Sequence, residues 1–337
     1  MLNKILKIIA LIVLSVYALV AAKNVLIPLF IAILIWFIIY EITTNIQSIK
    51  IGKYTFPRWL AYLFSTIIIA ITGYFILDAM IHNLREVNEL APKYQQNLRN
   101  FETWAQKTYN LDLEMISAGW LKEMDIQALV GSLLNQLSGL VSNSFMIVLY
   151  IIFIIIESEY FTPKLKQSIP KKSALLNTIE VLNNIKRSMG NYIILKTGVS
   201  IITGACSYII LLIIGVDLAF FWALLIFLLN YIPSVGSLIA TIFPSLVALF
   251  QFGALQPFLI VLFAIGTLQV IVGNFIEPKV FGDKLNINGF VVILALSVWG
   301  AIWGIAGMVL SVPIVLVTIA IFDQFPQTKG ISVFLKS

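Results

Sequence analysis

The sequence predicts an all-α polytopic membrane protein of about eight transmembrane helices, with two broken or re-entrant helices and a helical soluble insert. Of its 337 residues, 60% are hydrophobic and only 11% are charged, and the mean hydropathy is +0.98. An ordinary soluble domain of this length does not have such a composition. Most charged residues also lie in two stretches, 81–125 and 157–187, so long apolar segments remain between them.

Apolar runs of spanning length occur along the whole chain. A spanning helix needs about 20 apolar residues, and the candidate runs are 5–22, 25–41, 59–80, 138–157, 192–215, 219–251, 258–277 and 289–322. An unbroken helix over the first two runs would be about 55 Å long, so we expect a tight hairpin at Lys23 and Asn24. The runs divide the chain into residues 1–80 with three spans, the insert 81–137, residues 138–190 with the fourth span and an amphipathic helix, and the C-terminal core 191–337.

The distribution of Lys and Arg predicts the orientation. With eight crossings, the side that holds both termini carries fourteen of these residues and the other side carries eight, five of them in the insert. Because Lys and Arg accumulate in cytoplasmic loops, we expect both termini in the cytoplasm and the insert on the opposite side. The net charge of +6 therefore reflects membrane topology, and we expect no nucleic-acid partner.

The sequence offers no residues for common catalytic or metal sites. It has one cysteine, Cys206, and one histidine, His82, which excludes an intramolecular disulfide, a thiolate cluster and a Ser-His-Asp triad. There is no GxxxxGK[ST] motif, so ATP is not an energy source within this chain. No span contains a pair of carboxylates. We therefore expect no enzyme activity, no metal and no cofactor.

Two segments outside the spans show helical stripes of apolar residues. In the insert the stripe is Leu84, Val87, Ala91, Tyr94, Leu98, Phe101, Ala105 and Thr108. It indicates either two helices that fold back on each other or a heptad seam that joins copies of the chain. The second stripe is Leu175, Leu176, Ile179, Leu182, Ile185 and Met189. With Lys186 and Arg187 beside it, this stripe is typical of a helix lying on anionic lipid headgroups.

The runs 219–251 and 289–322 are each about ten residues longer than a bilayer needs. Helix-disrupting residues lie near the middle of both. They are Asn230, Pro233 and Gly236 in the first run, and Gly300, Gly304 and Gly307, followed by Pro313, in the second. Lipid cannot satisfy the backbone groups that such breaks release. Broken helices of this kind are buried in protein or line a watery cavity, as in many transporters.

Polar residues beside these breaks are candidates for a solute or ion pathway. Asn230 follows ten apolar residues, so its amide needs a partner or water. Pro278 disfavours helical geometry at Glu277 and frees backbone carbonyls there. That turn can bind a cation, a proton or a solute hydroxyl, or Glu277 can instead reach towards water and pair with Lys279. The full candidate set is Asn230, Pro233, Gly236, Gln269, Gly273, Asn274, Glu277, Pro278, Trp299 and Trp303.

Several of these residues have an alternative role in packing. The two tryptophans can stack on a ring-shaped solute or fill the core, and Gln269 can be an interface anchor. Gly300 and Gly304 have the GxxxG spacing of a close helix contact, so we assign Gly300, Gly304, Gly307 and Pro313 to packing and hinge motion. A shift of 69 residues superposes the two broken runs, which predicts a duplicated helix pair.

Three motifs resemble the autoinducer-2 exporter family, a family of eight-span bacterial membrane proteins also described as permeases. They are FLLNYIPSVGS at 227–237, VGNFIEPKVFGDKLNI at 272–287 and WGAIWGIAGMVLSVPI at 299–314. The order of spans, insert and amphipathic segment also agrees, so the resemblance covers nearly the whole chain. One departure is Asn288-Gly289, where many members have a His-Pro-like pair.

The resemblance implies a secondary transporter of the bacterial inner membrane that exports a small polar solute, such as the quorum-sensing signal autoinducer-2. It also implies a homo-oligomer. Some members resemble antiporters that exchange Na⁺ or Li⁺ for H⁺, and this function is the first alternative, with Glu277 as the titrating group. A membrane scaffold that binds partners through its insert is the second alternative.

Overall fold

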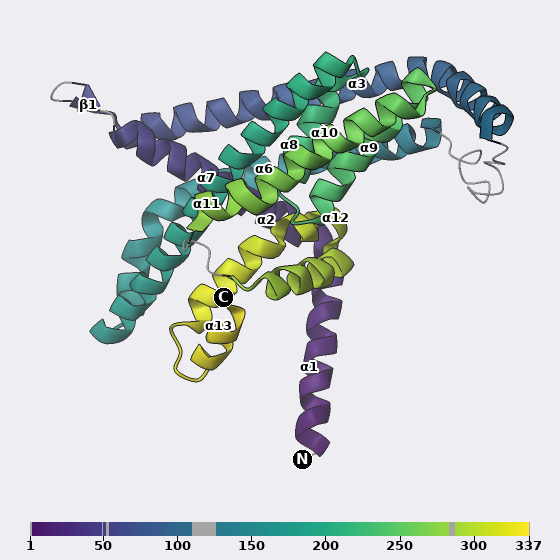
Figure 1. Cartoon of the computed structure of the whole chain (residues 1–337). Helices are drawn as coiled ribbons and strands as arrows, with labels where there is room; N and C mark the ends of the chain where they lie inside the picture. Colours follow the sequence, from purple (N-terminus) through teal and green to yellow (C-terminus); the bar gives the residue numbers. More distant parts are fainter. Residues whose placement is uncertain (1, 49, 52–53, 110–125, 283–286, 337) are drawn as a thin grey trace. The chain divides into compact units, whose positions relative to one another are not determined.

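The computed structural model describes residues 2–48, 50–51, 54–109, 126–282 and 287–336, and these residues are almost entirely helical (Figure 1). A two-residue antiparallel pair, β1 with β2, is the exception. The all-α class is therefore confirmed. The elements in chain order are α1 (Leu2–Ala21), α2 (Lys23–Ser48), β1 (Lys50–Ile51), β2 (Tyr54–Thr55), α3 (Arg58–Tyr109), α6 (Ile126–Ser168), α7 (Lys172–Ile214), α8 (Ala219–Leu229), α9 (Val235–Phe252), α10 (Leu255–Ile271), the π-helix η1 (Val272–Ile276), α11 (Glu277–Phe281), α12 (Gly289–Phe322) and α13 (Lys329–Leu335).

Seven helical segments in the described part of the chain are long and apolar enough to cross a membrane. They are Lys23–Ser48, Arg58–Asn83, Ser144–Ser168, Lys172–Ile214, Val235–Phe252, Leu255–Phe281 and Gly289–Phe322. Two shorter apolar helices, Ile9–Ala21 and Ala219–Leu229, accompany them. Each segment overlaps a run expected from the sequence, so this is a multi-pass membrane protein.

The chain forms two compact units, each built from separate pieces of sequence. Unit 1 comprises residues 1–67, 143–196 and 281–337, and unit 2 comprises residues 68–142 and 197–280. The core of unit 1 contains Trp36, Phe37, Met189, Tyr192, Ile193, Phe281, Val312 and Leu316. The core of unit 2 includes Tyr94, Phe101, Leu211, Phe221, Trp222, Ile226, Ala240, Ala248, Val261 and Ile265.

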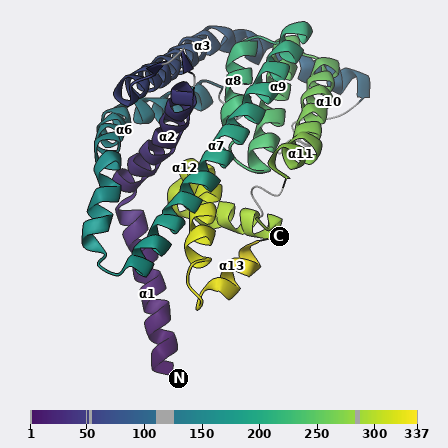
Figure 2. The ribbon, with the colours of Figure 1, turned by 90° about the vertical axis from the view of Figure 1, so that its left-hand side faces the viewer.

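In unit 2, α8 and α9 form a helical hairpin whose non-helical tip is Asn230–Ser234. Near the tip, a Cβ on Gly236 would overlap the carbonyl oxygen of Leu229. Farther from the tip, the rings of Trp222 and Phe243 stack with centroids 6.5 Å apart. In each pair the two residues lie equally far along the sequence from the same point in the tip. The two limbs therefore run antiparallel and side by side (Figures 1 and 2). The run that contains them folds back on itself.

In unit 1, α12 folds back in a similar way at Gly304, whose φ of 63° and ψ of −141° are not helical. A Cβ built on Gly300 would lie 3.0 Å from Met308 Cε, although eight residues of straight helix span about 12 Å. Ala295 and Val315 also share one apolar cluster. A positive φ is readily adopted by glycine, so Gly304 is where the chain reverses.

Both helix breaks thus lie where the sequence predicts them, and in both cases the chain reverses there. A run that folds back returns to the side at which it enters the membrane. The expected count of eight crossings therefore includes two runs that do not cross as single helices. Each hairpin also follows one long helical segment, α7 in the first case and α10 to α11 in the second. This order agrees with the internal repeat seen in the sequence.

The expected tight hairpin at Lys23 and Asn24 is wrong. Only Ala22 interrupts the helix, and its carbonyl oxygen accepts hydrogen bonds from the N–H groups of Val25 and Leu26. No residue there has a positive φ, so nothing forces the chain to reverse. α1 instead points away from the far end of α2 (Figures 1 and 2).

The basic amphipathic segment is also not a separate helix lying on lipid. It is the first half of α7, which continues without interruption into the following span. Met189 on its apolar stripe is buried in the core of unit 1, and Ile185 packs against that core. Lys186 lies over the ring of Tyr40, 5.6 Å from its centroid. The C-terminal part of the stripe, at Ile185 and Met189, is therefore covered by protein that includes α2.

The apolar stripe of the insert belongs to a single helix, since α3 runs from its span through Pro92 to Tyr109. We call residues 84–109 of α3 the arm. Tyr94 and Phe101 are stripe residues with described side chains, and both are buried in the core of unit 2. These two residues therefore pack within the subunit, onto the helices around the α8–α9 hairpin. Self-association through other stripe residues stays a prediction.

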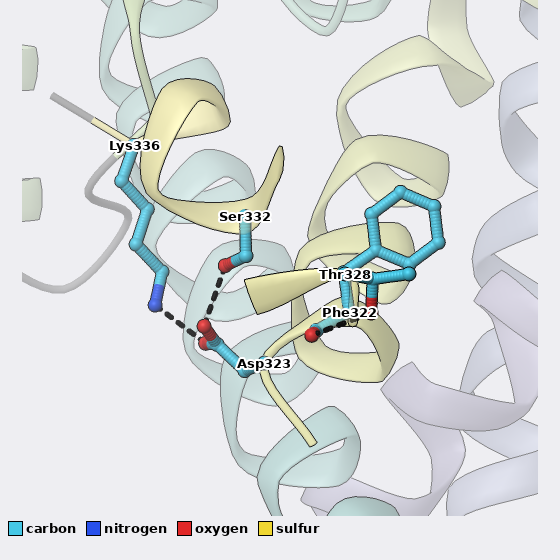
Figure 3. A network of polar contacts seen from close by, with 5 residues as sticks. All are labelled: Phe322, Asp323, Thr328, Ser332 and Lys336. Atoms are coloured by element: carbon cyan, nitrogen blue, oxygen red, sulfur yellow. Dashed lines mark hydrogen bonds and ion pairs between the residues drawn. The ribbon is translucent and has the colours of Figure 1, made fainter. Parts of the chain in front are cut away.

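The C-terminal helix α13 is held to the end of α12 by a polar network (Figure 3). Asp323 accepts hydrogen bonds from Ser332 Oγ and Lys336 Nζ. Burial opposes the charged form of this carboxyl, but the two hydrogen bonds and the charge of Lys336 outweigh it and hold the pKa of Asp323 below its ordinary value. The N–H of Asn288 also donates to the carbonyl oxygen of Leu335 at 3.0 Å.

Asp323→Asn is expected to loosen α13. Because the pKa is lowered on folding, the carboxylate stabilises the fold above the pKa of a free aspartate, about 3.9, and this contribution disappears as the pH falls through the folded pKa. The network is partly exposed and contributes about 1 kcal/mol, so trypsin should cut at Lys329 about fivefold faster in the variant at pH 7. Gln324→Ala is the control, and equal cleavage of both variants would contradict the prediction.

Candidate functional site

The tip of the α8–α9 hairpin is fastened to α7 by polar side chains. Asn230 is 6% exposed, and its Nδ2 donates to Ser200 Oγ at 3.0 Å. The hydroxyls of Tyr231 and Thr197 are 2.7 Å apart. The amide that the sequence analysis singled out therefore has a partner within the protein, as expected for a polar group in an apolar run.

The tip lies deep in the apolar part of unit 2. Ser200 lies 14 residues before Ile214, the last residue of α7, which is about 21 Å along a helix. A hydrocarbon core is about 30 Å thick, so the backbone break lies well inside it. Ser234 has a φ of 58° and a ψ of −55°, so its peptide groups do not follow either limb. Gly236 is buried against Leu229, which closes the hairpin.

α10 runs antiparallel to α9, because only Gly253 and Ala254 join them. A Cβ on Gly266 would lie 3.6 Å from Thr241 Cγ2, so these two positions are level along the pair. By the same register, Gly273 is level with Ser234 at the tip. The predicted candidates Gly273 and Asn274 thus lie at the depth of the hairpin break, on the π-helix η1.

The expectation that Pro278 disrupts the helix at Glu277 is wrong. Glu277 is helical, with φ −57° and ψ −53°, and its N–H donates to the carbonyl oxygen of Val272, five residues earlier. Proline lacks an N–H and its ring collides with the carbonyl of the preceding turn. The wider π-turn accommodates the proline and keeps the helix continuous. Such π-turns are frequent at functional sites.

Gln269 lies one turn closer to the tip than Gly266. It continues the buried face of α10, which contains Val261 and Ile265 in the core of unit 2. Only 8% of Gln269 is exposed, and its Nε2 has no hydrogen-bond partner among the described residues. An unsatisfied buried donor of this kind costs about 1–3 kcal/mol.

The two tryptophans lie in unit 1, at the reversal of α12. Trp303 is buried, its Nε1 donates to the carbonyl oxygen of Leu19 at 3.1 Å, and its ring lies 5.3 Å from that of Phe30. Trp299 packs on Trp303 at 4.9 Å. Gly307 is buried where a Cβ would overlap the Trp299 carbonyl oxygen. This geometry favours the packing interpretation for these residues.

The base of the α8–α9 hairpin is fastened to the arm by a second polar cluster, which we call the clasp. It consists of Tyr94, Asn97, Asp217 and Gln251. Tyr94 Oη donates to Asp217 Oδ2 at 3.1 Å, and Asn97 Nδ2 donates to the carbonyl oxygens of Phe250 and Gln251. Gln251 Nε2 donates to Asp217 Oδ1, and the N–H of Asp217 donates back to Gln251 Oε1. Burial, the charge of Asp217 and the hydrogen bond from Tyr94 to Asp217 raise the pKa of Tyr94.

The clasp also shows which end of unit 2 the hairpin opens towards. Its residues bond the arm to the start of α8 and to the end of α9. The α7–α8 and α9–α10 connections therefore lie at the end of unit 2 that contacts the arm. A cavity of about 800 Å³ opens there, lined by Gly253, Ala254, Leu255, Gln256, Leu259, Ile260 and Phe263. It is mostly apolar and lies at the opposite end of the α9–α10 pair from Gln269. The polar groups of the tip, rather than this cavity, form the candidate site.

The chemistry at the tip consists of hydrogen-bonding groups. No group of three or more His, Cys, Asp or Glu side chains that could hold a metal ion occurs in the part of the chain that was described. Among buried polar residues of that part, Lys196 is the charged one, and it precedes Ser200 by one turn on the same face of α7. Such groups are suited to hydrogen bonds with a polar solute.

Comparison with known proteins agrees with this architecture. The model of the AI-2E family transporter matches residues 6–327. The chain belongs to the AI-2E transporter family. It is therefore a membrane transporter, and the three motifs of the sequence analysis occupy the α8–α9 tip, the η1–α11 segment and the reversal of α12.

Similar proteins include the "AI-2 transport protein TqsA" of Escherichia coli strain K12, which is 29% identical over 322 residues, or 93% of this chain and 90% of TqsA. A "Putative transport protein" of Borreliella burgdorferi is 28% identical over 319 residues, 93% of this chain and 85% of that protein. Another of Haemophilus influenzae is 30% identical over 280 residues, 81% of this chain and 80% of that protein.

Sequence reasoning missed the partners of the tip in this AI-2E transporter. Thr197 and Ser200 lie in an apolar helix, where a hydroxyl commonly bonds to the carbonyl of the preceding turn. Nothing in their spacing distinguishes such a residue from one that contacts another helix. Tyr94 and Asn97 were missed as partners for a related reason, because only the fold brings the arm to the hairpin base. Asp217 offered a signal, since a carboxylate between two apolar runs needs a partner.

Proposed function

We propose that this chain is a secondary transporter that exports a small polar solute, the quorum-sensing signal autoinducer-2 (AI-2), across the bacterial inner membrane. The observation that carries the proposal is the re-entrant α8–α9 hairpin, whose polar tip is fastened to α7 deep inside unit 2. The relative TqsA is named for AI-2 transport. This name supports AI-2 as the solute to test first.

In the proposed cycle the tip closes the pathway. Asn230 and Tyr231 hold the tip to Ser200 and Thr197, and breaking these two contacts releases it from α7. Hairpins with Gly and Pro at their turns can move as units while the surrounding helices stay packed. Movement of the tip would then open the polar groups of unit 2 to each side of the membrane in turn.

We also propose that the C-terminus lies in the cytoplasm and the insert on the opposite side, and that the N-terminus lies on the side of the insert, because α1 continues into α2. Because the α8–α9 run folds back, α10 leads the chain away from the arm side. Lys279 then lies on the side that carries most of the other Lys and Arg residues. This side therefore still carries most of the positive charge, as the cytoplasmic side should. A homo-oligomer remains part of the proposal.

The test uses purified protein in liposomes, assayed for AI-2 efflux and for proton flux driven by Na⁺ or Li⁺. AI-2 efflux without cation-dependent proton flux is the expected result. Glu277→Gln should leave AI-2 efflux within twofold of the wild type, because Glu277 lies at the end of α10 and η1, beyond the tip. Glu159→Gln, at an exposed position of α6, is the matched control.

Other outcomes select the alternatives. Cation-dependent proton flux that Glu277→Gln abolishes would make this chain an antiporter. If well-folded vesicles show neither flux, both transport mechanisms fail and the scaffold remains. In that case deletion of residues 85–125 should remove the cellular phenotype, whereas Asn230→Leu should not.

A further inference from the structure

Gln269 places an unsatisfied hydrogen-bond donor inside unit 2. Its side chain continues the face of α10 that packs under the hairpin limbs, yet its Nε2 contacts no acceptor among the described residues. Proteins rarely leave a buried donor unpaired. Burial removes its hydrogen bond to water, and without a new acceptor this loss of free energy is not compensated. The apolar neighbours Val261 and Ile265 show that an aliphatic side chain would suit this face as well.

The first turn of α9 lies at the same depth as this amide along the α9–α10 pair. By the register of Gly266 with Thr241, Gln269 is level with Leu238, one residue after Ser237. The backbone N–H groups of Ser234 and Ser237 donate to no described atom, whereas those of the residues between them are bonded to carbonyls of the tip. A helix N-terminus with open N–H groups attracts acceptor oxygens.

We propose that the Gln269 amide and the first turn of α9 form the binding site for the transported solute. This inference rests on the proposed function and specifies its chemistry. The unpaired donors on both sides of the site are Gln269 Nε2 and the N–H groups of Ser234 and Ser237. They match a solute that presents hydroxyl, carbonyl or anionic oxygens. An alkali cation needs several oxygen ligands, of which the Gln269 side chain supplies one, so a midpoint shift with NaCl alone would overturn the proposal.

Ligand binding and tip movement are coupled at this site. Gln269 Nε2 is fully buried, so a solute reaches it only after the tip moves away from α10. The solute then supplies the acceptor that the closed form lacks. Binding therefore favours the open form, since a ligand shifts an equilibrium towards the state in which it makes more contacts.

Thermal unfolding of the purified protein tests the site without a transport assay. The probes are AI-2 and inorganic phosphate, and NaCl at matched ionic strength is the cation arm. A probe present at a hundredfold excess over its Kd should raise the unfolding midpoint of the wild type by about 5 °C. Gln269→Leu should abolish this shift, whereas Gln256→Leu, at an exposed position of the same helix, should keep it.

Gln269→Leu also separates recognition from a structural role. The variant removes an unpaired donor, so it should unfold no earlier than the wild type, while its AI-2 efflux at low AI-2 concentration falls at least tenfold. The inference is overturned if neither probe shifts the wild-type midpoint, or if Gln269→Leu keeps the shift. A midpoint shift with phosphate alone would support the site and reject AI-2 as the solute. Normal AI-2 efflux by Gln269→Leu would instead leave the export proposal standing without this site.

Discussion

Gly236→Ala is expected to abolish transport and to lower the free energy of unfolding by about 2–3 kcal/mol. The added Cβ would overlap the carbonyl oxygen of Leu229 and press on the Cβ of Ile232. Backbone atoms cannot rotate out of the way as a flexible side chain can, so the two limbs must separate at the tip. Separation would also pull Asn230 away from Ser200. The measurement is solute efflux from liposomes together with unfolding in detergent.

Gly198→Ala is the matched control for this substitution. Gly198 lies in α7, and a Cβ there would meet no atom within 4 Å. Alanine in a helix is favoured over glycine by up to about 1 kcal/mol, so this variant should be as stable as the wild type or more stable. If Gly236→Ala behaves like Gly198→Ala in both assays, the limbs of the hairpin are not in contact.

The positions of the helix breaks were predictable from sequence, because Pro and Gly beside a buried Asn conflict with a continuous spanning helix. Whether the chain kinks or reverses at the break was not predictable from sequence. A kinked span and a re-entrant hairpin present the same apolar residues in the same order. The choice depends on whether limbs such as those of α8 and α9 can pack against each other, which the small residues Gly236 and Ala240 allow.

Local rules misled the prediction where the packing of distant segments decides. Pro278 predicted a helix end, yet the π-turn of η1 absorbs it. A tight hairpin was predicted at Lys23 and Asn24 because the combined helix seemed too long for a bilayer, yet hydrogen bonds continue across Ala22. The stripe that ends at Met189 predicted contact with lipid, since no pattern within α7 reveals that α2 covers it.

Sequence patterns indicated several residues of the candidate site, but not the residues that hydrogen-bond to them. Asn230, Gln269 and Gly273 were identified because polar or helix-weakening residues are conspicuous in apolar runs. Their alignment in depth depends on the antiparallel packing of α9 with α10, and only the fold provides it. Ser200 has no such signal, because serine is common inside membrane helices and often bonds to its own backbone.

Asp217→Ala is expected to lower the free energy of unfolding by about 3 kcal/mol, because it breaks the clasp. The carboxylate accepts hydrogen bonds from Tyr94 and Gln251, and hydrogen bonds to charged groups contribute about 1.5–3 kcal/mol each. Tyr94 is 2% exposed, so its hydroxyl would be left without an acceptor in a place that water hardly reaches. The arm would then detach from the hairpin base.

Tyr94→Phe keeps the ring in the core of unit 2 and removes only the hydroxyl. It should lower the free energy of unfolding by about 1 kcal/mol. In the Asp217→Ala background it should have little further effect or even a stabilising one, because the hydroxyl no longer has its acceptor. Such coupling is the signature of a direct interaction. Additive effects of the two substitutions would contradict the clasp.

The pH dependence of stability provides an independent measurement of the same contact. Folding raises the pKa of Tyr94, because burial and the nearby Asp217 charge both oppose the phenolate. Its stabilising contribution is therefore complete below the pKa of a free tyrosine, about 10, and decreases as the pH rises above that value. The wild type should lose stability more steeply between about pH 9 and 11 than Tyr94→Phe does. Tyr74→Phe removes a hydroxyl from the membrane-spanning part of α3 and leaves the clasp intact, so it is the matched control.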